Sequence, residues 1–157
     1  MEEQRVNDSG TDGGTGGDFR NNIVTNCSSG LYVTTAHAAT PSATLANSDF
    51  NDWFNLIGSN SLIYQDSFYT YAQWRTATGF DGSSMTTNPG LTATFTPTSG
   101  SPIKGAGVNL IGLGISALNA DKAGFARSPI GPWSMGAYEL SSQTVINPPT
   151  LLTAIVR

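Results

Sequence analysis

The chain has 157 residues, the length of a single domain, and 11% of them are charged, against roughly 25% in an average domain. Thr, Ser, Asn and Gly supply 66 of the 157 residues, which favours short strands and tight turns and argues against a helical bundle. The chain has only seven Lys and Arg residues and a net charge of −4, which argues against a nucleic-acid partner. It has a single cysteine, which excludes an intrachain disulfide.

The segment 1–18 is predicted to be a flexible, glycine-rich lead-in. Its end, GGTGGD, matches the start of the calcium-binding nonapeptide of a β-roll. That pattern requires a large apolar residue two positions after its Asp, where this chain has Arg20, so no calcium site is expected. The first ten residues contain no apolar segment, which predicts no signal peptide. No other stretch reaches the ~20 apolar residues of a membrane span.

Two short segments, NNIVTN and FNDWFN, share an Asn-x-x-x-Asn pattern. They place Asn22 and Asn26 29 residues before Asn51 and Asn55. Asn tolerates left-handed backbone and bonds its own main chain, so it suits the corners between short strands. A repeat of this length is typical of solenoids, and it predicts coils that stack Asn above Asn, with these four residues in structural roles.

The segment FYTYAQWRTATG is the best helix candidate, near residues 70–78. Thr70 can cap the helix, Tyr71 and Trp74 fall on one face, and Gly79 can end it. Trp74 is expected to anchor the core.

The second half of the chain is rich in turn signals. The alternation in LTATFTP predicts a strand over 91–97, and a turn with a short closing strand is predicted over 128–140. Residues 141–157 form a tail or linker, in which the apolar run 151–156 is predicted to be a strand. It is expected to pack against the domain or against another chain.

Five motifs follow one another over residues 48–139. They are Asp49-Phe50-Asn51, Trp74 with Gly79 and Asp81, Gly100-Ser101-Pro102-Ile103, Asp121 with Gly124 and Arg127, and Gly136-Ala137-Tyr138-Glu139. This order resembles the C-terminal coils of right-handed parallel β-helix proteins of the pectate-lyase-like class. The resemblance implies an all-β fold, a short right-handed parallel β-helix over residues 19–140, with one small capping helix near 70–78. It also implies that the central coils, which carry the catalytic groove in full members, are not represented here.

Polysaccharide cleavage requires paired carboxylates, or a carboxylate cluster with a base. The weak catalytic candidates are Asp49 and Asp81, with Arg75 as base or charge stabiliser. Asp52 and Asp66 are further candidate carboxylates, and Lys104 is the alternative to Arg75 as base or charge stabiliser. Asp49 and Asp52 are an odd number of positions apart, so a regular strand would place them on opposite faces.

The single histidine and the single cysteine carry no catalytic signature. His37 lies in a stretch of small residues without a nucleophile elbow, and we interpret it as a loop residue. Cys27 is interpreted as a small buried residue. One His and one Cys are too few for a metal site of that type, and neither a metal nor a cofactor is expected.

Aromatic and charged residues give the remaining site candidates. Tyr64, Tyr69 and Tyr71 can stack on sugar rings, or they can pack around the predicted helix. Asp121 and Arg127 are expected to form a structural ion pair or to cap loops.

The sequence predicts a non-catalytic structural or binding module of a virion, such as a decoration or tail component, or of a secreted surface protein, with glycan contact left open. The alternative is a C-terminal fragment of a polysaccharide lyase or glycoside hydrolase. A short solenoid exposes one end and its strand edges. We therefore expect a homo-oligomer or a neighbouring structural protein as partner, no nucleic acid, and an extracellular or virion-surface location.

Overall fold

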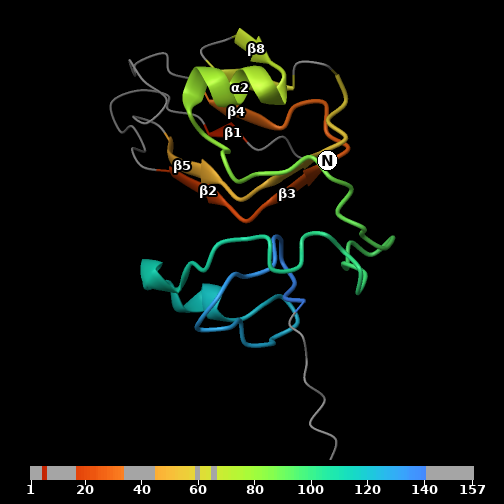
Figure 1. The fold of residues 1–157 in the computed structure, drawn as a ribbon, viewed down its shortest axis with the longest axis vertical. Coiled ribbons are helices and arrows are strands. Elements are labelled where there is room, and N and C mark those ends of the chain that lie inside the picture. The colour runs from red at the N-terminus through yellow and green to blue at the C-terminus, as the bar shows by residue number, and fades with distance from the viewer. Residues whose placement is uncertain (1–4, 7–16, 34–44, 59–60, 65–66, 141–157) are drawn as a thin grey trace, which may run out of the picture.

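A computed structural model of the chain describes residues 5–6, 17–33, 45–58, 61–64 and 67–140 (Figure 1). Its elements in chain order are β1 (Arg5–Val6), β2 (Gly17–Arg20), β3 (Ile23–Thr25), β4 (Leu31–Val33), β5 (Leu45–Asp49), β6 (Asp52–Phe54), β7 (Leu62–Tyr64), β8 (Ser67–Tyr69), α2 (Tyr71–Thr78) and the 3-10 helices η1 (Ile111–Leu113) and η2 (Ser116–Asn119). No helix in these residues has the length and apolar character needed to cross a membrane.

The strands form three small sheets, with the orders β1-β4-β7-β8, β2-β5 and β3-β6. All pairs are parallel except β7 with β8, which is antiparallel. Ile23 lies beside Asp52 and Val24 beside Trp53. The chain turns a corner between β2 and β3, and a second corner between β5 and β6. Each corner has one residue with left-handed backbone, Asn21 with φ of 60° in the first and Phe50 with φ of 55° in the second.

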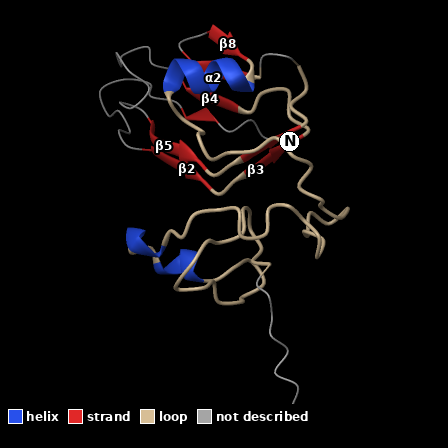
Figure 2. Cartoon of the chain, in the orientation of Figure 1, coloured by secondary structure: helices blue, strands red, loops and turns tan. Residues whose placement is uncertain are grey.

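The predicted right-handed parallel β-helix is wrong. The parallel strands lie in separate sheets of four, two and two strands, and no solenoid sheet runs through the described residues. Beyond Asp81 the chain forms turns, isolated bridges and the two 3-10 helices in place of strands (Figure 2). Glycines with left-handed backbone recur in that part, at positions 90, 105, 114, 124, 131 and 136. They reverse the chain too often for paired strands to extend.

The two strands predicted in the second half are also wrong. Residues 91–97 form a tight turn, with only an isolated bridge between Leu91 and Pro97. Phe95 is left-handed there, with φ of 59°. The alternating threonines bond one another and the local main chain, since Thr96 N donates to Thr92 Oγ1 at 3.2 Å, and such bonds compete with a strand ladder. Residues 128–140 contain bends and no strand.

The helix predicted near residues 70–78 is confirmed as α2. Thr70 caps it through a capping box with Gln73, and Gly79 ends it in the left-handed conformation, with φ of 74°. These are the two signals from which the helix was predicted. Trp74 is the buried residue of the helix and belongs to the core, as predicted. The expected role of the helix as the cap of a solenoid is wrong, because there is no solenoid.

Buried side chains gather in two places, which define two lobes. The N-terminal lobe, made of the described residues up to 87, has a core of Phe19, Leu31, Val33, Leu45, Trp53, Leu62, Tyr64 and Trp74. The C-terminal lobe, residues 88–140, buries Ile103, Leu110, Trp133 and Met135. This second lobe lies beneath β2 and β3 in Figure 1 and is mostly loop (Figure 2).

Replacing Trp74 with Ala should destabilise the fold strongly. The side chain is fully buried, and its Nε1 donates to Asp81 Oδ2 at 2.8 Å. We expect Trp74→Ala to lower the free energy of unfolding by roughly 3–5 kcal/mol, measured by denaturant titration. The exposed neighbour Thr76 is the control, and Thr76→Ala should change stability by less than about 0.5 kcal/mol. An unchanged melting temperature for the Trp74 variant would contradict the assigned packing.

Candidate functional site

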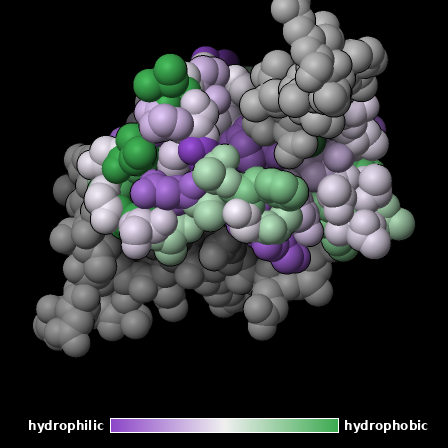
Figure 3. Space-filling view, turned by 90° about the horizontal axis from the view of Figure 1, so that it is seen from below, coloured by the Kyte–Doolittle hydropathy of each residue, from purple (hydrophilic) through white to green (hydrophobic). Residues whose placement is uncertain are grey.

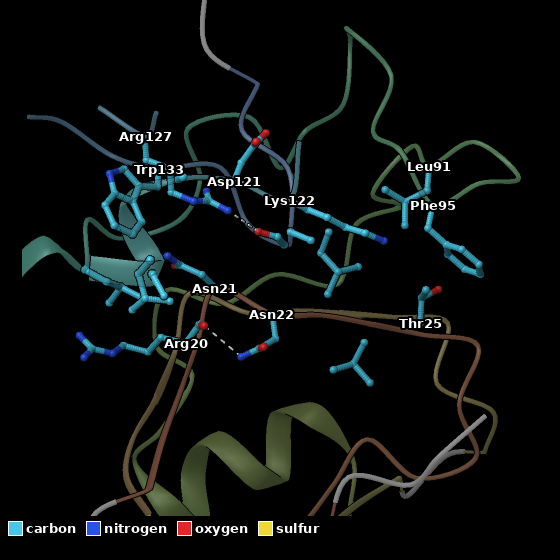
Figure 4. A pocket seen from close by; sticks show the side chains of 18 of the residues that line it. Arg20, Asn21, Asn22, Thr25, Leu91, Phe95, Asp121, Lys122, Arg127 and Trp133 are labelled. Carbon is cyan, nitrogen blue, oxygen red and sulfur yellow. Dashed lines mark hydrogen bonds between the residues drawn. The ribbon is translucent and has the colours of Figure 1, made fainter. Parts of the chain in front are cut away.

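A cavity of about 870 Å³ lies between the two lobes (Figure 4). One wall is the β2–β3 corner and the chain that follows it. The other wall comes from the C-terminal lobe. The cavity is lined by residues 20–25, Cys27, Ser29 and Gly30 on the first wall, and by Leu91, Phe95, Leu110, Ala117, Leu118, Ala120, Asp121, Lys122, Arg127, Trp133, Gly136 and Ala137 on the second.

Asn21 connects the two lobes by hydrogen bonds. Its Nδ2 donates to Val108 O at 2.7 Å, and its Oδ1 accepts from Val108 N at 2.8 Å. Its main-chain carbonyl accepts from Gly136 N at 2.7 Å. A Cβ on Gly107 would lie 2.7 Å from Asn21 Oδ1, so glycine is required there for this close approach. The repeat pattern includes the neighbouring Asn22 but not Asn21, for which the only signal in the sequence is the tolerance of asparagine for left-handed backbone.

The four repeat asparagines lie in two contacting pairs. Asn22 Nδ2 donates to Asn51 Oδ1 at 3.1 Å, and Asn55 Nδ2 donates to Asn26 Oδ1 at 2.5 Å. Asn51 is fully buried and also donates to Phe19 O at 2.8 Å. Asn22 lies in the cavity wall, whereas the Asn26–Asn55 pair is exposed.

The weak catalytic candidates all lie at the turn of residues 81–83, where Arg75 Nη2 donates to Gly82 O at 3.3 Å, but they do not form an exposed acid–base set. Asp81 is fully buried and accepts hydrogen bonds from Trp74, Ser48, Asn51 and Ser84. Asp49 Oδ1 accepts from the main-chain nitrogens of Phe50 and Ser83, at 2.9 and 2.6 Å. Arg75 is exposed, and the central carbon of its guanidinium group, Cζ, lies 5.7 Å from the centre of the Tyr71 ring. None of the three candidates lines the interlobe cavity.

The three tyrosine candidates have different environments. Tyr64 is buried in the N-terminal core, and this burial raises the pKa of its hydroxyl. The Tyr71 hydroxyl bonds the carbonyls of Asp81 and Ser84, at 3.0 and 2.8 Å. Tyr69 is half-buried on β8. The structure therefore does not bring them together as one exposed platform for a sugar.

Asp121 and Arg127 hold the loops of the C-terminal lobe, each with a different partner. Asp121 accepts from the main-chain nitrogens of Ala123, Phe125 and Glu139, at 2.8, 2.8 and 3.0 Å. Burial alone would raise the pKa of Asp121, but these three donors together with Arg127 hold it below its ordinary value. Arg127 pairs with Glu139 at 3.0 Å instead of with Asp121.

Asp52 is the most unusual titratable residue among those that the structure describes. It is fully buried on β6, and neither carboxylate oxygen has a hydrogen-bond partner. Burial raises its pKa to about 7, from an ordinary value of 3.8. Its neighbours in the sheet register are Ile23 on one side and Met85 on the other. Asp52 was one of the candidate carboxylates of the sequence, but the sequence pattern gave no sign of its burial.

Several sequence candidates lie outside the described residues. These are His37, Asp66, most of the segment 1–18, and the tail 141–157. Lys104 is exposed. Within the described part of the chain, no group of three or more His, Cys, Asp or Glu side chains could hold a metal ion.

Comparisons with known protein families, with characterised proteins and with solved structures found no match. The resemblance seen in the sequence therefore stays a prediction as regards family.

The pH dependence of stability should reveal the ionisation of Asp52. Because folding raises its pKa, its contribution to stability is fully present below about pH 4 and is lost as the pH rises to about 7. We expect Asp52→Asn to remove this slope and to raise the free energy of unfolding at pH 8 by about 1–3 kcal/mol. Denaturant unfolding between pH 4 and 8.5 measures both effects.

The control for this experiment is Asp18→Asn. Asp18 is exposed and paired with Arg20, so that variant should keep the pH slope of the parent. Equal slopes in the parent and in Asp52→Asn would show that Asp52 is hydrated in solution.

Proposed function

We propose that this protein is a non-catalytic structural module that assembles with further copies of itself through its C-terminal lobe. The observation that supports the proposal is the exposure of large apolar side chains on that lobe. Ile130 is 80% exposed and Phe125 is 55% exposed. Three more apolar residues are exposed around η1 and η2, namely Ile111, Leu113 and Ile115.

The exposed apolar side chains are candidates for contact with a second copy of the chain. Figure 3 views the molecule from the side of the C-terminal lobe, where hydrophobic residues reach the surface at several separate places among polar ones. Exposed apolar side chains mark contacts with other proteins where they gather into a patch, and these five are between 43% and 80% exposed. Burying such a side chain stabilises a complex by about 1.5–3 kcal/mol.

The use of the carboxylates supports a non-catalytic role. Asp81, Asp121 and Glu139 each accept hydrogen bonds that hold loops or the helix in place. Asp52 is sealed from solvent. Glycosidic bond cleavage needs an acid and a base that both reach the substrate, and these four carboxylates serve other contacts or are buried. The neutral polar composition supports a place on a virion surface or in a secreted protein.

The solution mass tests the assembly. We expect a concentration-dependent oligomer between about 1 and 100 µM by analytical ultracentrifugation. Ile115→Ser and Ile130→Ser should each weaken association by about 10- to 150-fold, because each removes one buried apolar side chain. Ala123→Ser, which changes an exposed small residue of the same lobe, should have no effect. A monomer at every concentration would contradict the proposal.

An activity screen tests the enzymatic alternative. We expect no unsaturated, ultraviolet-absorbing product from acidic polysaccharides and no reducing sugar from neutral ones. An activity that is abolished by Asp49→Asn, but preserved in a variant of an exposed residue such as Thr76→Ala, would refute the non-catalytic role.

A further inference from the structure

The buried carboxyl group of Asp52 lies on the face of β6 that is turned toward the C-terminal lobe. We propose that Asp52 controls the contact between the two lobes. Its neutral carboxyl group allows the C-terminal lobe to lie on β3 and β6, and its ionisation makes the lobes separate while each stays folded. This inference is independent of the proposed assembly, because it concerns a contact within one chain.

The sheet register shows which way the Asp52 side chain points. Residues that lie side by side in a parallel pair place their side chains on the same face of the sheet, and Asp52 lies beside Ile23. The Ile23 side chain reaches the C-terminal lobe, since a Cβ on Gly136 would lie only 2.7 Å from Ile23 Cδ1. The next pair, Val24 and Trp53, points to the opposite face and packs in the N-terminal core. Asp52 therefore faces the C-terminal lobe.

The C-terminal lobe covers this face of the sheet. It lies beneath β2 and β3 (Figure 1), and the Asp52 side chain is fully buried. A buried carboxyl group normally has hydrogen-bond partners, yet neither oxygen of Asp52 has one among the described residues. The ionised form loses far more hydration energy by such burial than the neutral form does. Contact between the lobes is thus compatible with a neutral Asp52 and costly for an ionised one.

No charge in the described residues offsets this cost. Asp52 lies between Ile23 and Met85 in the sheet register, and both are uncharged. Burial is the cause of its raised pKa, without a contribution from a charged neighbour. Lys104 is exposed. The other charged side chains on the surrounding elements are engaged elsewhere, and they are Asp18, Arg20, Asp49, Asp81, Asp121, Lys122, Arg127 and Glu139.

The contact between the lobes rests on few hydrogen bonds. In the described part of the chain these bonds all involve Asn21, which makes two with the main chain of Val108 and accepts one from Gly136 N. Each lobe buries apolar residues of its own, and the described chain passes from one lobe to the other at residues 87–88. Separation would therefore break no strand pair. It would open the interlobe cavity to solvent.

The effect of pH on this contact has a definite sign. Separation exposes Asp52 and returns its pKa from about 7 to the ordinary 3.8. Protonation therefore favours the closed lobes below about pH 4, and this advantage is lost as the pH rises to about 7. Between about pH 5 and about pH 8, the equilibrium constant for closure should fall roughly 100-fold. The cavity would be closed in acidic surroundings and would open above neutral pH.

Hydrogen exchange measured by NMR on the full chain tests the proposal. The amides of Val108 and Gly136 donate to Asn21 across the lobe contact. Their protection factors, which exclude the intrinsic effect of pH on exchange, should fall roughly 100-fold between about pH 5 and about pH 8. At each pH they should stay below those of the Asp81 and Asp121 amides, which bond within their own lobes. Protection at the lobe contact that ignores pH, or that equals that of these two amides, would overturn the proposal.

Asp52→Asn identifies the titrating group. The variant keeps the size of the side chain and cannot ionise, so the protection factors of Val108 and Gly136 should agree at the two pH values within about threefold. Asp18→Asn changes an exposed carboxylate and should keep the full fall. If the fall persists in Asp52→Asn, another group titrates at the lobe contact and the proposal is wrong.

Asn21→Gly separates hydrogen bonding from titration. Glycine accepts the left-handed φ of 60° at this corner, and the change removes the two bonds to Val108. The Gly136 amide should lose about tenfold in protection at every pH, while its dependence on pH remains. Unchanged protection at Gly136 would show that the lobes do not open by breaking the bonds of Asn21, which contradicts the proposal.

Discussion

The N-terminal lobe depends on one buried carboxylate, that of Asp81. It accepts from the indole of Trp74 in α2, from Ser48 in β5 and from the Asn51 amide at the β5–β6 corner. Asn51 in turn donates to Phe19 O in β2 and accepts from Asn22 N. A buried charge is costly unless hydrogen bonds satisfy it, so this network allows one arrangement of helix, corner and strands. In the same lobe the Phe19 ring stacks on the Trp53 ring, with 5.6 Å between the ring centres.

Local signals in the sequence were sufficient for some elements and insufficient for the fold. Helix α2 could be predicted because Thr70 and Gly79 act on their own turns. The spacing of Asn22 from Asn51 pointed to two segments that do contact each other. A motif order does not fix how far strand pairing continues, because that depends on contacts between distant residues. Beyond Asp81 the frequent left-handed glycines prevent a continuous sheet.

The candidate site, like the fold, depends on contacts between distant residues that could not be predicted from the sequence. The cavity arises from two segments that are far apart in the sequence, and Asn21 joins them by bonds to Val108 and Gly136. Nothing in the residues around Asn21 indicates those partners. The burial of Asp52 was equally hidden, because the pattern of β6 places Asp52 and Trp53 on opposite faces and both faces turn out to be covered. Sequence patterns report which face of a strand a residue takes, but they do not report what covers that face.

The C-terminal lobe is held by polar contacts more than by an apolar core, and this explains how it can expose apolar residues. Arg127 and Glu139 pair with side chains only 8% and 7% exposed, and Arg127 also lies over Trp133 at 5.3 Å. Such buried pairs add little net stability, but they are costly to break and so favour one loop arrangement. With its loops fixed in this way, the lobe does not need Phe125 or Ile130 for its own core. Those side chains remain at the surface, where a partner can bury them.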